Sequence, residues 1–366
     1  SNCVNSGLRR IYVLTQYKSA SLQRHIRMGW NIMPAELGEF VEVLPAQQRV
    51  GDKWYLGTAD AIYQNINVIE NEKPDEVLIL AGDHIYKMDY QRMINFHRRH
   101  DADLTVGVVE MSAEMSGQLG IIEFDDSKRV RGFEEKPSKS NTKITDNKVY
   151  ASMGIYVFKT EVLEQVLRED AHRESQHDFG KNIIPLMVSQ KLNVFAYNFY
   201  DENGKEAQYW RDIGTIDAYY EANMDLVSVT PMFNLYDKEW PVRTYQEQFP
   251  PVKTVFSGED DKKRIGLILD SLVSSGCIIS GGRVQRSVLS PNVRVNSYSE
   301  VYDSILLEGV DVGRYSKIKR AIIDKDVRIP QNTVIGYDTE EDRKRFTVTD
   351  SGIVVVAKGQ RLKKGH

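Results

Sequence analysis

Apolar residues recur at a fixed interval of seventeen positions through the C-terminal third of the chain. One register of this repeat is Val284, Val301, Ile318 and Ile335. Apolar positions that recur at a fixed period predict a stacked solenoid, whose coils bury their apolar side chains against one another. This interval is too short for a pair of helices, so we expect a parallel β-helix of about three coils, with an ordinary β sandwich as the alternative. The further registers are Val288, Ile305 and Ile322; Val293, Val310 and Val327; and Val295, Val312 and Ile329.

The chain before this repeat has a different organisation. Up to about residue 228, short apolar segments alternate with helical stretches, which predicts an α/β domain with a mixed, mostly parallel sheet and helices on both faces. Prolines and a charged run fill residues 229–265, as is typical of an interdomain connection. We therefore expect a domain at 1–228, a linker at 229–265 and a β-helix at 266–366, in line with the length of 366 residues.

The composition excludes several classes of protein. The net charge of −4 gives no general attraction to nucleic acid or to anionic membranes. No apolar run approaches the roughly 20 residues that span a bilayer. Cys3 and Cys277 are the only cysteines and lie far apart in the sequence, so no disulfide framework is expected and a cytoplasmic location fits.

Asp83 follows an uninterrupted apolar run at residues 77–80. Such a run predicts a strand of a parallel sheet that is buried on both faces. Ligands of open α/β sheets bind beyond the carboxyl ends of the strands, so this carboxylate is placed to hold a metal ion against phosphate. The alternative is that Asp83 caps the helix expected at residues 90–100.

Further candidate residues stand at other element boundaries. Gly57 and Thr58 open a helix whose free N–H groups favour an anion, although Thr58 can equally be a plain cap. Lys136 follows a strand and can hold a sugar phosphate, although a surface ion pair is the simpler interpretation. Asp212 precedes another helix and, with Asp83, can share one Mg²⁺ ion through oxygen ligands.

Taken in order, these motifs resemble those of ADP-glucose pyrophosphorylases, the glucose-1-phosphate adenylyltransferases of bacterial glycogen synthesis. The resemblance covers nearly the whole chain, and GTADA and HDFGK favour this family over relatives that make UDP- or dTDP-sugars. The matching motifs are SNCVNSG (1–7), LPAQQR (44–49), WYLGTADA (54–61), LAGDHIYKMDY (80–90), FEEKP (133–137), SMGIYVF (152–158), HDFGKNIIP (177–185) and YWRDIGT (209–215).

The resemblance implies a Rossmann-like nucleotidyltransferase domain followed by a left-handed parallel β-helix. It also implies a homotetramer that uses Mg²⁺ to convert ATP and glucose 1-phosphate into ADP-glucose and pyrophosphate. It assigns Asp83 and Asp212 to the metal and, with Lys136, to catalysis. The other implied residues are Tyr55, Gly120, Glu135, Lys136, Ser152 and Asp178 for glucose 1-phosphate, and Gln47, Tyr55, Gly57 and Thr58 for the nucleotide.

Two further expectations follow from the resemblance. Members of the family have a strand and a glycine-rich loop before SNCVNSG, which the 366 residues do not include. Because that loop carries a charge-stabilising arginine, we expect the 366-residue chain by itself to lack turnover. Members are also regulated by anionic metabolites, and Lys325 and Lys358 stand at effector-binding positions, although a solvated basic tail is the alternative.

Two other functions compete with this one. Many hexapeptide solenoids are acyltransferases with a histidine base, but residues 278–336 contain no histidine. A non-catalytic regulatory subunit that binds sugar nucleotide or effector is the second alternative.

Overall fold

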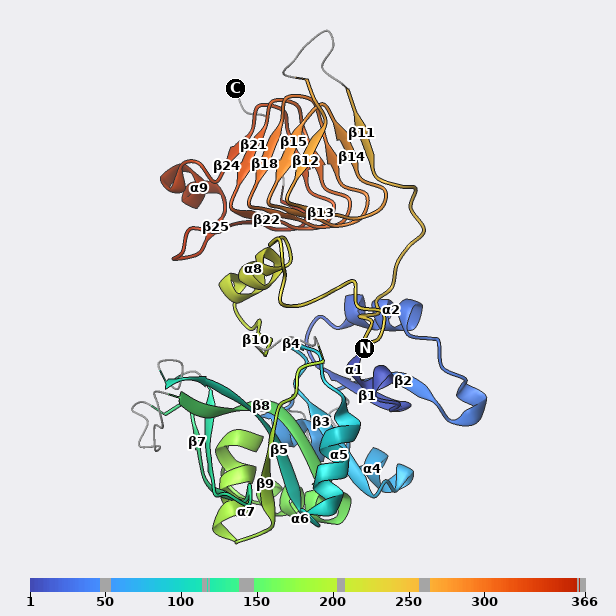
Figure 1. The fold of residues 1–366 in the computed structure, drawn as a ribbon, viewed down its shortest axis with the longest axis vertical. Coiled ribbons are helices and arrows are strands. Elements are labelled where there is room, and N and C mark those ends of the chain that lie inside the picture. Colours follow the sequence, from blue (N-terminus) through green and yellow to red (C-terminus); the bar gives the residue numbers. More distant parts are fainter. Residues whose placement is uncertain are drawn as a thin grey trace. The chain divides into compact units, whose positions relative to one another are not determined.

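The structure is a computed structural model that describes residues 1–46, 54–113, 117, 119–137, 148–202, 208–256, 264–360 and 362. The described chain forms two compact units (Figure 1). Unit 1 contains residues 1–82, 87–210 and 237–245, and unit 2 contains residues 83–86, 211–236 and 246–366. The predicted linker, 229–265, is thus shared between the two units.

A mixed sheet lies at the centre of unit 1, with the strand order β7-β6-β8-β5-β9 and β3 also paired with β8. β5 and β9 are parallel, whereas β8 runs antiparallel to β3, β5 and β6. These strands are β3 (Glu76–Leu80), β5 (Leu104–Ser112), β6 (Gly120–Phe124), β7 (Val130–Glu135), β8 (Lys148–Lys159) and β9 (Val194–Asn198). A separate parallel pair joins β1 (Arg10–Thr15) to β2 (Phe40–Pro45).

Antiparallel pairs are more frequent in the described part of this sheet than the alternation of elements indicated. The β6–β7 link is a short turn with no crossover helix, and a turn of that length can join only antiparallel strands. β3 also departs from the expected buried parallel strand, since it runs antiparallel to β8 and all five of its residues are half-buried.

The helices of unit 1 pack on this sheet through amphipathic faces. Leu163, Val166 and Leu167 of α6 are buried with Leu104 and Val106 of β5 in one apolar cluster, and their spacing is that of a helix with one apolar stripe. The described helices are α1 (Asn2–Asn5), α2 (Ala20–Gly29), η1 (Ala35–Leu37), α3 (Thr58–Tyr63), α4 (Ile66–Glu72), α5 (Tyr90–Arg99), α6 (Thr160–Ala171), the π-helical η3 (Phe179–Ile183) and α7 (Ile184–Ser189).

Unit 2 is built around a parallel β-helix with three stacked sheets (Figure 1). The predicted register is confirmed, because Val284, Val301, Ile318 and Ile335 pair in sequence across one face and are all buried. The first sheet contains β11 (Lys253–Val255), β14 (Ile278–Ser280), β17 (Arg294–Val295), β20 (Asp311–Val312) and β23 (Arg328–Ile329). The second contains β12 (Leu267–Leu269), β15 (Arg283–Gln285), β18 (Glu300–Tyr302), β21 (Lys317–Lys319) and β24 (Val334–Ile335). The third contains β13 (Leu272–Val273), β16 (Val288–Leu289), β19 (Ile305–Leu306), β22 (Ala321–Ile323), β26 (Val354–Val356) and β25 (Thr347–Val348).

The solenoid is longer than the three coils expected from the repeat. Two of its described sheets have five strands and the third has six. The sequence repeat did not identify the outer coils, because their spacing differs from the regular interval of seventeen residues. Leu267 pairs with Arg283, one position short of that interval, and Ile322 pairs with Val355, almost two intervals further along the chain. The latter stretch contains α9 (Thr339–Arg345).

Two smaller elements complete unit 2. β4 (His84–Tyr86) and β10 (Trp210–Asp212) form a two-stranded sheet. α8 (Ile216–Asp225) follows and packs on the solenoid, where the Tyr220 hydroxyl donates to the carbonyl of Asp303 at 2.7 Å. Among the described helices, none has the length and apolar character that a membrane span requires.

Candidate active site

Glu135 ends β7 at a point where two glycines leave room for its carboxylate. Gly120 lies opposite it in the β6–β7 register. A Cβ atom on Gly120 would lie 2.6 Å from Glu135 Oε2, and one on Gly180 would lie 2.5 Å from the same oxygen. Side chains at these two positions would displace the carboxylate, so the glycines define its place.

Asp178 presents the second carboxylate of this site, and its backbone contacts fix it in place. It caps η3, with Oδ1 accepting hydrogen bonds from the N–H groups of Gly180 at 2.9 Å and Lys181 at 3.0 Å. Oδ2 accepts a third hydrogen bond from the Thr58 hydroxyl at 3.0 Å. Asp178 is therefore a helix cap, and these same hydrogen bonds orient its carboxylate.

The two carboxylates affect each other electrostatically. Burial raises the pKa of Glu135, the negative charge of Asp178 raises it further, and Lys136 and Lys181 oppose this. Among the described residues none donates a hydrogen bond to the Glu135 carboxylate. This half-buried acceptor would therefore gain from a ligand that brings hydroxyl donors.

Sequence reasoning singled out Ser152 but missed Tyr156 on the same strand. Ser152 is buried in β8, and its Oγ lies 3.5 Å from the Tyr156 hydroxyl. Burial raises the pKa of Tyr156 to about 12, and Glu135 and Asp178 contribute to this shift. The interval of four residues was the available signal, because residues an even number apart share one face of a strand.

Lys136 directly follows β7 and has an exposed side chain. Its backbone has a positive φ of 48°, and its N–H donates to the carbonyl of Leu119 at 3.1 Å. The ammonium group is thus adjacent in sequence to the Glu135 carboxylate and remains accessible to an anionic ligand.

The start of α3 differs from the free anion site that the sequence predicted. The carbonyl of His177 accepts hydrogen bonds from the N–H groups of Ala59 at 2.8 Å and Asp60 at 3.3 Å. The Thr58 hydroxyl donates to Asp178 and accepts from the N–H of Phe179 at 3.1 Å. The N–H groups of Ala59 and Asp60 are therefore already hydrogen-bonded, so the prediction that they are free to bind an anion was wrong. The nucleotide-binding roles of Gly57 and Thr58 stay predictions.

Of the other two residues assigned to the nucleotide, Gln47 lies outside the described residues. Tyr55 lies just before α3, where its N–H donates to Gln16 Oε1 at 2.8 Å and its hydroxyl accepts from Asn65 Nδ2 at 2.9 Å. Gln16, which no motif identified, therefore fixes the backbone of Tyr55.

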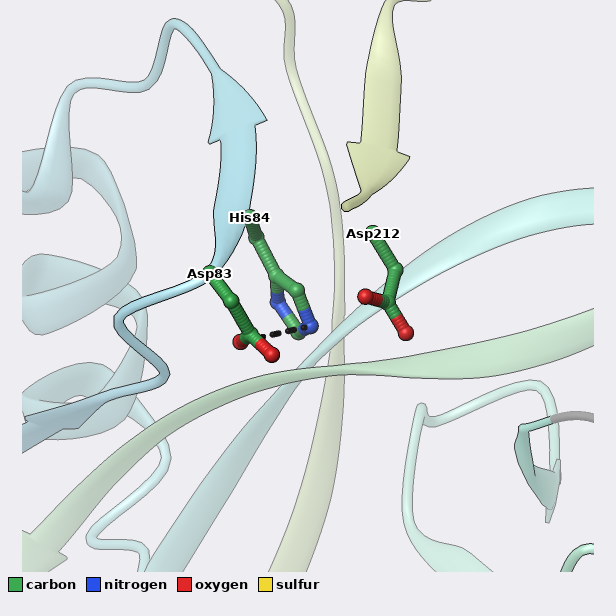
Figure 2. A group of neighbouring side chains, drawn as sticks. All are labelled: Asp83, His84 and Asp212. Atoms are coloured by element: carbon green, nitrogen blue, oxygen red, sulfur yellow. Dashed lines mark ion pairs between the residues drawn. The ribbon is translucent and has the colours of Figure 1, made fainter. Parts of the chain in front are cut away.

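Unit 2 contains a second group of candidate residues, Asp83, His84 and Asp212. Figure 2 shows their side chains around a common space, and one potential ligand atom from each lies within 4.8 Å of the others. The N–H of Gly214 donates to Asp212 Oδ1 at 2.7 Å, and the N–H of Ile213 donates to the carbonyl of Asp83 at 3.0 Å. The second bond and the pairing of β4 with β10 hold the two acids together although they lie far apart in the sequence.

The same geometry decides between the two interpretations of Asp83. The helix that begins at Tyr90 is capped by Asp89, whose side chain accepts from the N–H of Gln91 at 2.9 Å. Asp83 is therefore not the cap, and its side chain is 60% exposed. Two carboxylates and an imidazole are donors that suit a divalent cation. His84 was missed, although it directly follows Asp83.

Lys325 and Lys358 are close in the solenoid through a shared acidic residue. Asp324 accepts hydrogen bonds from the N–H of Lys325 at 2.7 Å and from that of Lys358 at 3.1 Å. The Lys358 ammonium also pairs with Asp326 at 2.8 Å. Their effector role stays a prediction.

Comparison with known proteins agrees with this architecture. Residues 1–229 match the family model described as nucleotidyl transferase, and residues 250–356 match the one described as GlmU-like, C-terminal hexapeptide. The glucose-1-phosphate adenylyltransferase of Koribacter versatilis is 56% identical over 99% of this chain and 87% of its own. Those of Rhodopirellula baltica and Methylococcus capsulatus are 55% and 51% identical over 99% of this chain, and 82% and 86% of their own.

The fold therefore defines a nucleotidyl transferase whose catalytic domain is followed by a left-handed hexapeptide β-helix, as predicted. Within that class the extent of the similarity is decisive, because it covers nearly the whole chain at more than half identity. The chain belongs to the glucose-1-phosphate adenylyltransferase family.

Proposed function

We propose that this enzyme converts ATP and glucose 1-phosphate into ADP-glucose and pyrophosphate, the committed step of glycogen or starch synthesis. The observation that carries the proposal is the carboxylate pair of Glu135 and Asp178 beside Gly120 and Gly180. Family membership supports the same reaction.

The carboxylate pair suits a sugar better than a second anion. Sugar hydroxyls donate hydrogen bonds, and carboxylates are strong acceptors for them. A donor placed at Glu135 would offset the cost of its burial and of its repulsion by Asp178. The small residues around Glu135 allow a ring to approach, and Ser152 and Tyr156 supply further hydroxyl groups.

Lys136 is the residue that we assign to the phosphate of glucose 1-phosphate. Its side chain is exposed and directly follows Glu135. A lysine ammonium binds phosphate as a point charge and tolerates movement of the ligand. One sugar phosphate would thus meet acceptors at its hydroxyls and a cation at its phosphate.

Asp83 and Asp212 would hold a divalent cation, which we propose to be Mg²⁺. Two carboxylate oxygens fit its preference for oxygen ligands, and Mg²⁺ is commonly shared between carboxylates and substrate phosphates. When bound, such an ion neutralises negative charge on the phosphates of ATP. Asp83 then positions charge and need not accept a proton.

The chemistry requires no covalent intermediate with the protein. A phosphate oxygen of glucose 1-phosphate attacks the α-phosphorus of ATP, the bond from this phosphorus to the bridging oxygen breaks, and pyrophosphate leaves with that electron pair. The attacking oxygen is already anionic, so no general base is needed. Positioning and charge stabilisation are the main contributions of a protein to such transfers.

We also propose that the enzyme is a cytoplasmic homotetramer regulated by anionic metabolites. Asp324 holds the backbones of Lys325 and Lys358 near each other by accepting from both backbone N–H groups, which supports an effector role for this basic pair. Unchanged effector response in Lys325→Ala and Lys358→Ala variants would argue against this role.

The test is an assay of the protein as its gene encodes it, with ATP, glucose 1-phosphate and Mg²⁺. We expect ADP-glucose and pyrophosphate in equal amounts, and far less sugar nucleotide when UTP replaces ATP. Binding of glucose 1-phosphate without product would favour the non-catalytic alternative, and a preference for UTP would overturn the assignment of the nucleotide.

A further inference from the structure

The loop before Asp178 contains a polar cluster that the proposed chemistry does not use. Asp170, near the end of α6, is only 4% exposed. Its Oδ2 lies 2.8 Å from His177 Nδ1, and its Oδ1 accepts from the Ser175 hydroxyl at 2.8 Å. Ser175 Oγ in turn accepts from the backbone N–H of His177 at 2.9 Å. A carboxylate only accepts, so His177 Nδ1 carries the hydrogen in this bond.

These contacts hold His177 in a strained backbone conformation. Its φ is +51°, in the left-handed region that residues other than glycine seldom occupy. Histidine and asparagine tolerate this region better than most residues. The side-chain bond to Asp170 and the backbone bond to Ser175 both stabilise the turn.

The turn determines what the next residues contact. It directs the His177 carbonyl to the N–H groups that begin α3. A Cβ atom at Gly57 would lie 2.3 Å from the carbonyl oxygens of both Gln176 and His177, so only glycine permits this approach. Asp178 directly follows His177, and its carboxylate accepts a hydrogen bond from the Thr58 hydroxyl of α3.

We infer that His177 is a positioning residue for the sugar site. Its hydrogen bond to Asp170 holds the left-handed turn, and the turn places the Asp178 carboxylate for the hydroxyl groups of glucose 1-phosphate. This inference rests on the proposed function, because it needs Asp178 to contact the sugar. His177 acts through Asp178 and is not itself expected to contact substrate.

The variant His177→Leu removes the donor and disfavours the turn, whereas His177→Asn keeps a side-chain N–H donor and tolerates the positive φ. For His177→Leu we expect a rise of about 10-fold to 100-fold in KM for glucose 1-phosphate, as small displacements of binding groups produce. KM for ATP should rise less than KM for glucose 1-phosphate, although the turn also contacts the start of α3, where Gly57 and Thr58 lie. His177→Asn should recover most of the loss, and His172→Leu, at an exposed neighbouring histidine, should resemble the wild type.

A second experiment separates positioning from a loss of folding. Combined with Asp178→Ala, the His177→Leu change should have no further effect on KM for glucose 1-phosphate, because it acts through Asp178. Thermal unfolding is recorded for every variant, and the milder Ser175→Ala takes the place of any that does not fold. An unchanged KM for glucose 1-phosphate, or equal rises for both substrates, would overturn the inference. Absence of product with the wild-type protein as its gene encodes it would instead overturn the proposed function.

Discussion

Substitution of Gly180 by alanine tests the place of Glu135 without removing any functional group. The new Cβ would lie 2.5 Å from Glu135 Oε2 and 3.1 Å from its Cδ. Ordinary contacts begin near about 3.5 Å, so the carboxylate must retreat by about 1 Å. The group that moves is the end of a flexible side chain, and Gly180 has no positive φ, so the backbone can stay in place.

The expected effect is a loss of sugar affinity with little loss of stability. A displacement of about 1 Å can cost on the order of 100-fold, and a hydrogen bond to a charged group contributes about 1.5–3 kcal/mol. We therefore predict that KM for glucose 1-phosphate rises by about 10-fold to 100-fold. The free energy of unfolding should change by less than about 1 kcal/mol, because alanine has the higher helix propensity.

The assay is steady-state formation of ADP-glucose with glucose 1-phosphate varied at saturating ATP. Gly132→Ala is the matched control, because its Cβ would lie 3.4 Å from the nearest atom, Glu123 Oε2. In a Glu135→Ala background, Gly180→Ala should have no further effect. An unchanged KM for glucose 1-phosphate in a folded Gly180→Ala variant would refute the role of Glu135.

Three further predictions concern the metal, the solenoid and pH. Asp83→Asn and Asp212→Asn should each weaken Mn²⁺ binding by at least about tenfold, measured from the electron paramagnetic resonance signal of free Mn²⁺. Ile318→Ala should lower the free energy of unfolding by about 2–5 kcal/mol in denaturant titrations, whereas the exposed Lys317→Ala should change it by about 0.5 kcal/mol or less. Because burial raises the pKa of Glu135, the Glu135 carboxyl binds a proton more tightly in the folded wild type than in the unfolded chain. The stability of the wild type therefore falls as pH rises through the raised pKa. Glu135→Gln should therefore have a higher melting temperature than the wild type at neutral pH. The difference should vanish at a pH below the ordinary pKa range of a glutamate.

Each of these predictions has an outcome that contradicts it. Unaltered Mn²⁺ affinity in both aspartate variants would place the cation elsewhere. Equal losses of stability for Ile318→Ala and Lys317→Ala would mean that the stacked apolar positions do not carry the solenoid. A melting difference for Glu135→Gln that grows as the pH falls would reverse the proposed sign.

The regular parts of the structure could be read from the sequence, and the irregular parts could not. Val301 and Ile318 repeat at the interval of one coil, so periodicity alone indicated the β-helix. The outer coils were hidden by the shortened interval after Leu267 and by the insertion of α9. Local patterns likewise indicated a strand at β3, but the predicted parallel direction was wrong, because pairing depends on a partner much further along the chain, in β8.

The candidate site shows the same division. Motifs pointed to Glu135 and Asp178, but their proximity and the raised pKa of Glu135 arise from packing between β7 and η3. The N–H groups at the start of α3 were wrongly predicted to be free, because their acceptor, the carbonyl of His177, comes from a loop much later in the chain. No local rule connects a backbone carbonyl to a helix that far away, so such contacts require the folded chain.

The most direct test of the proposed sugar site is an experimental structure of this protein with glucose 1-phosphate bound. We expect sugar hydroxyls within about 2.5–3.0 Å of the carboxylates of both Glu135 and Asp178, which is the range of O–H···O hydrogen bonds. A sugar ring bound elsewhere, with both carboxylates left to solvent, would contradict the assignment of these two residues.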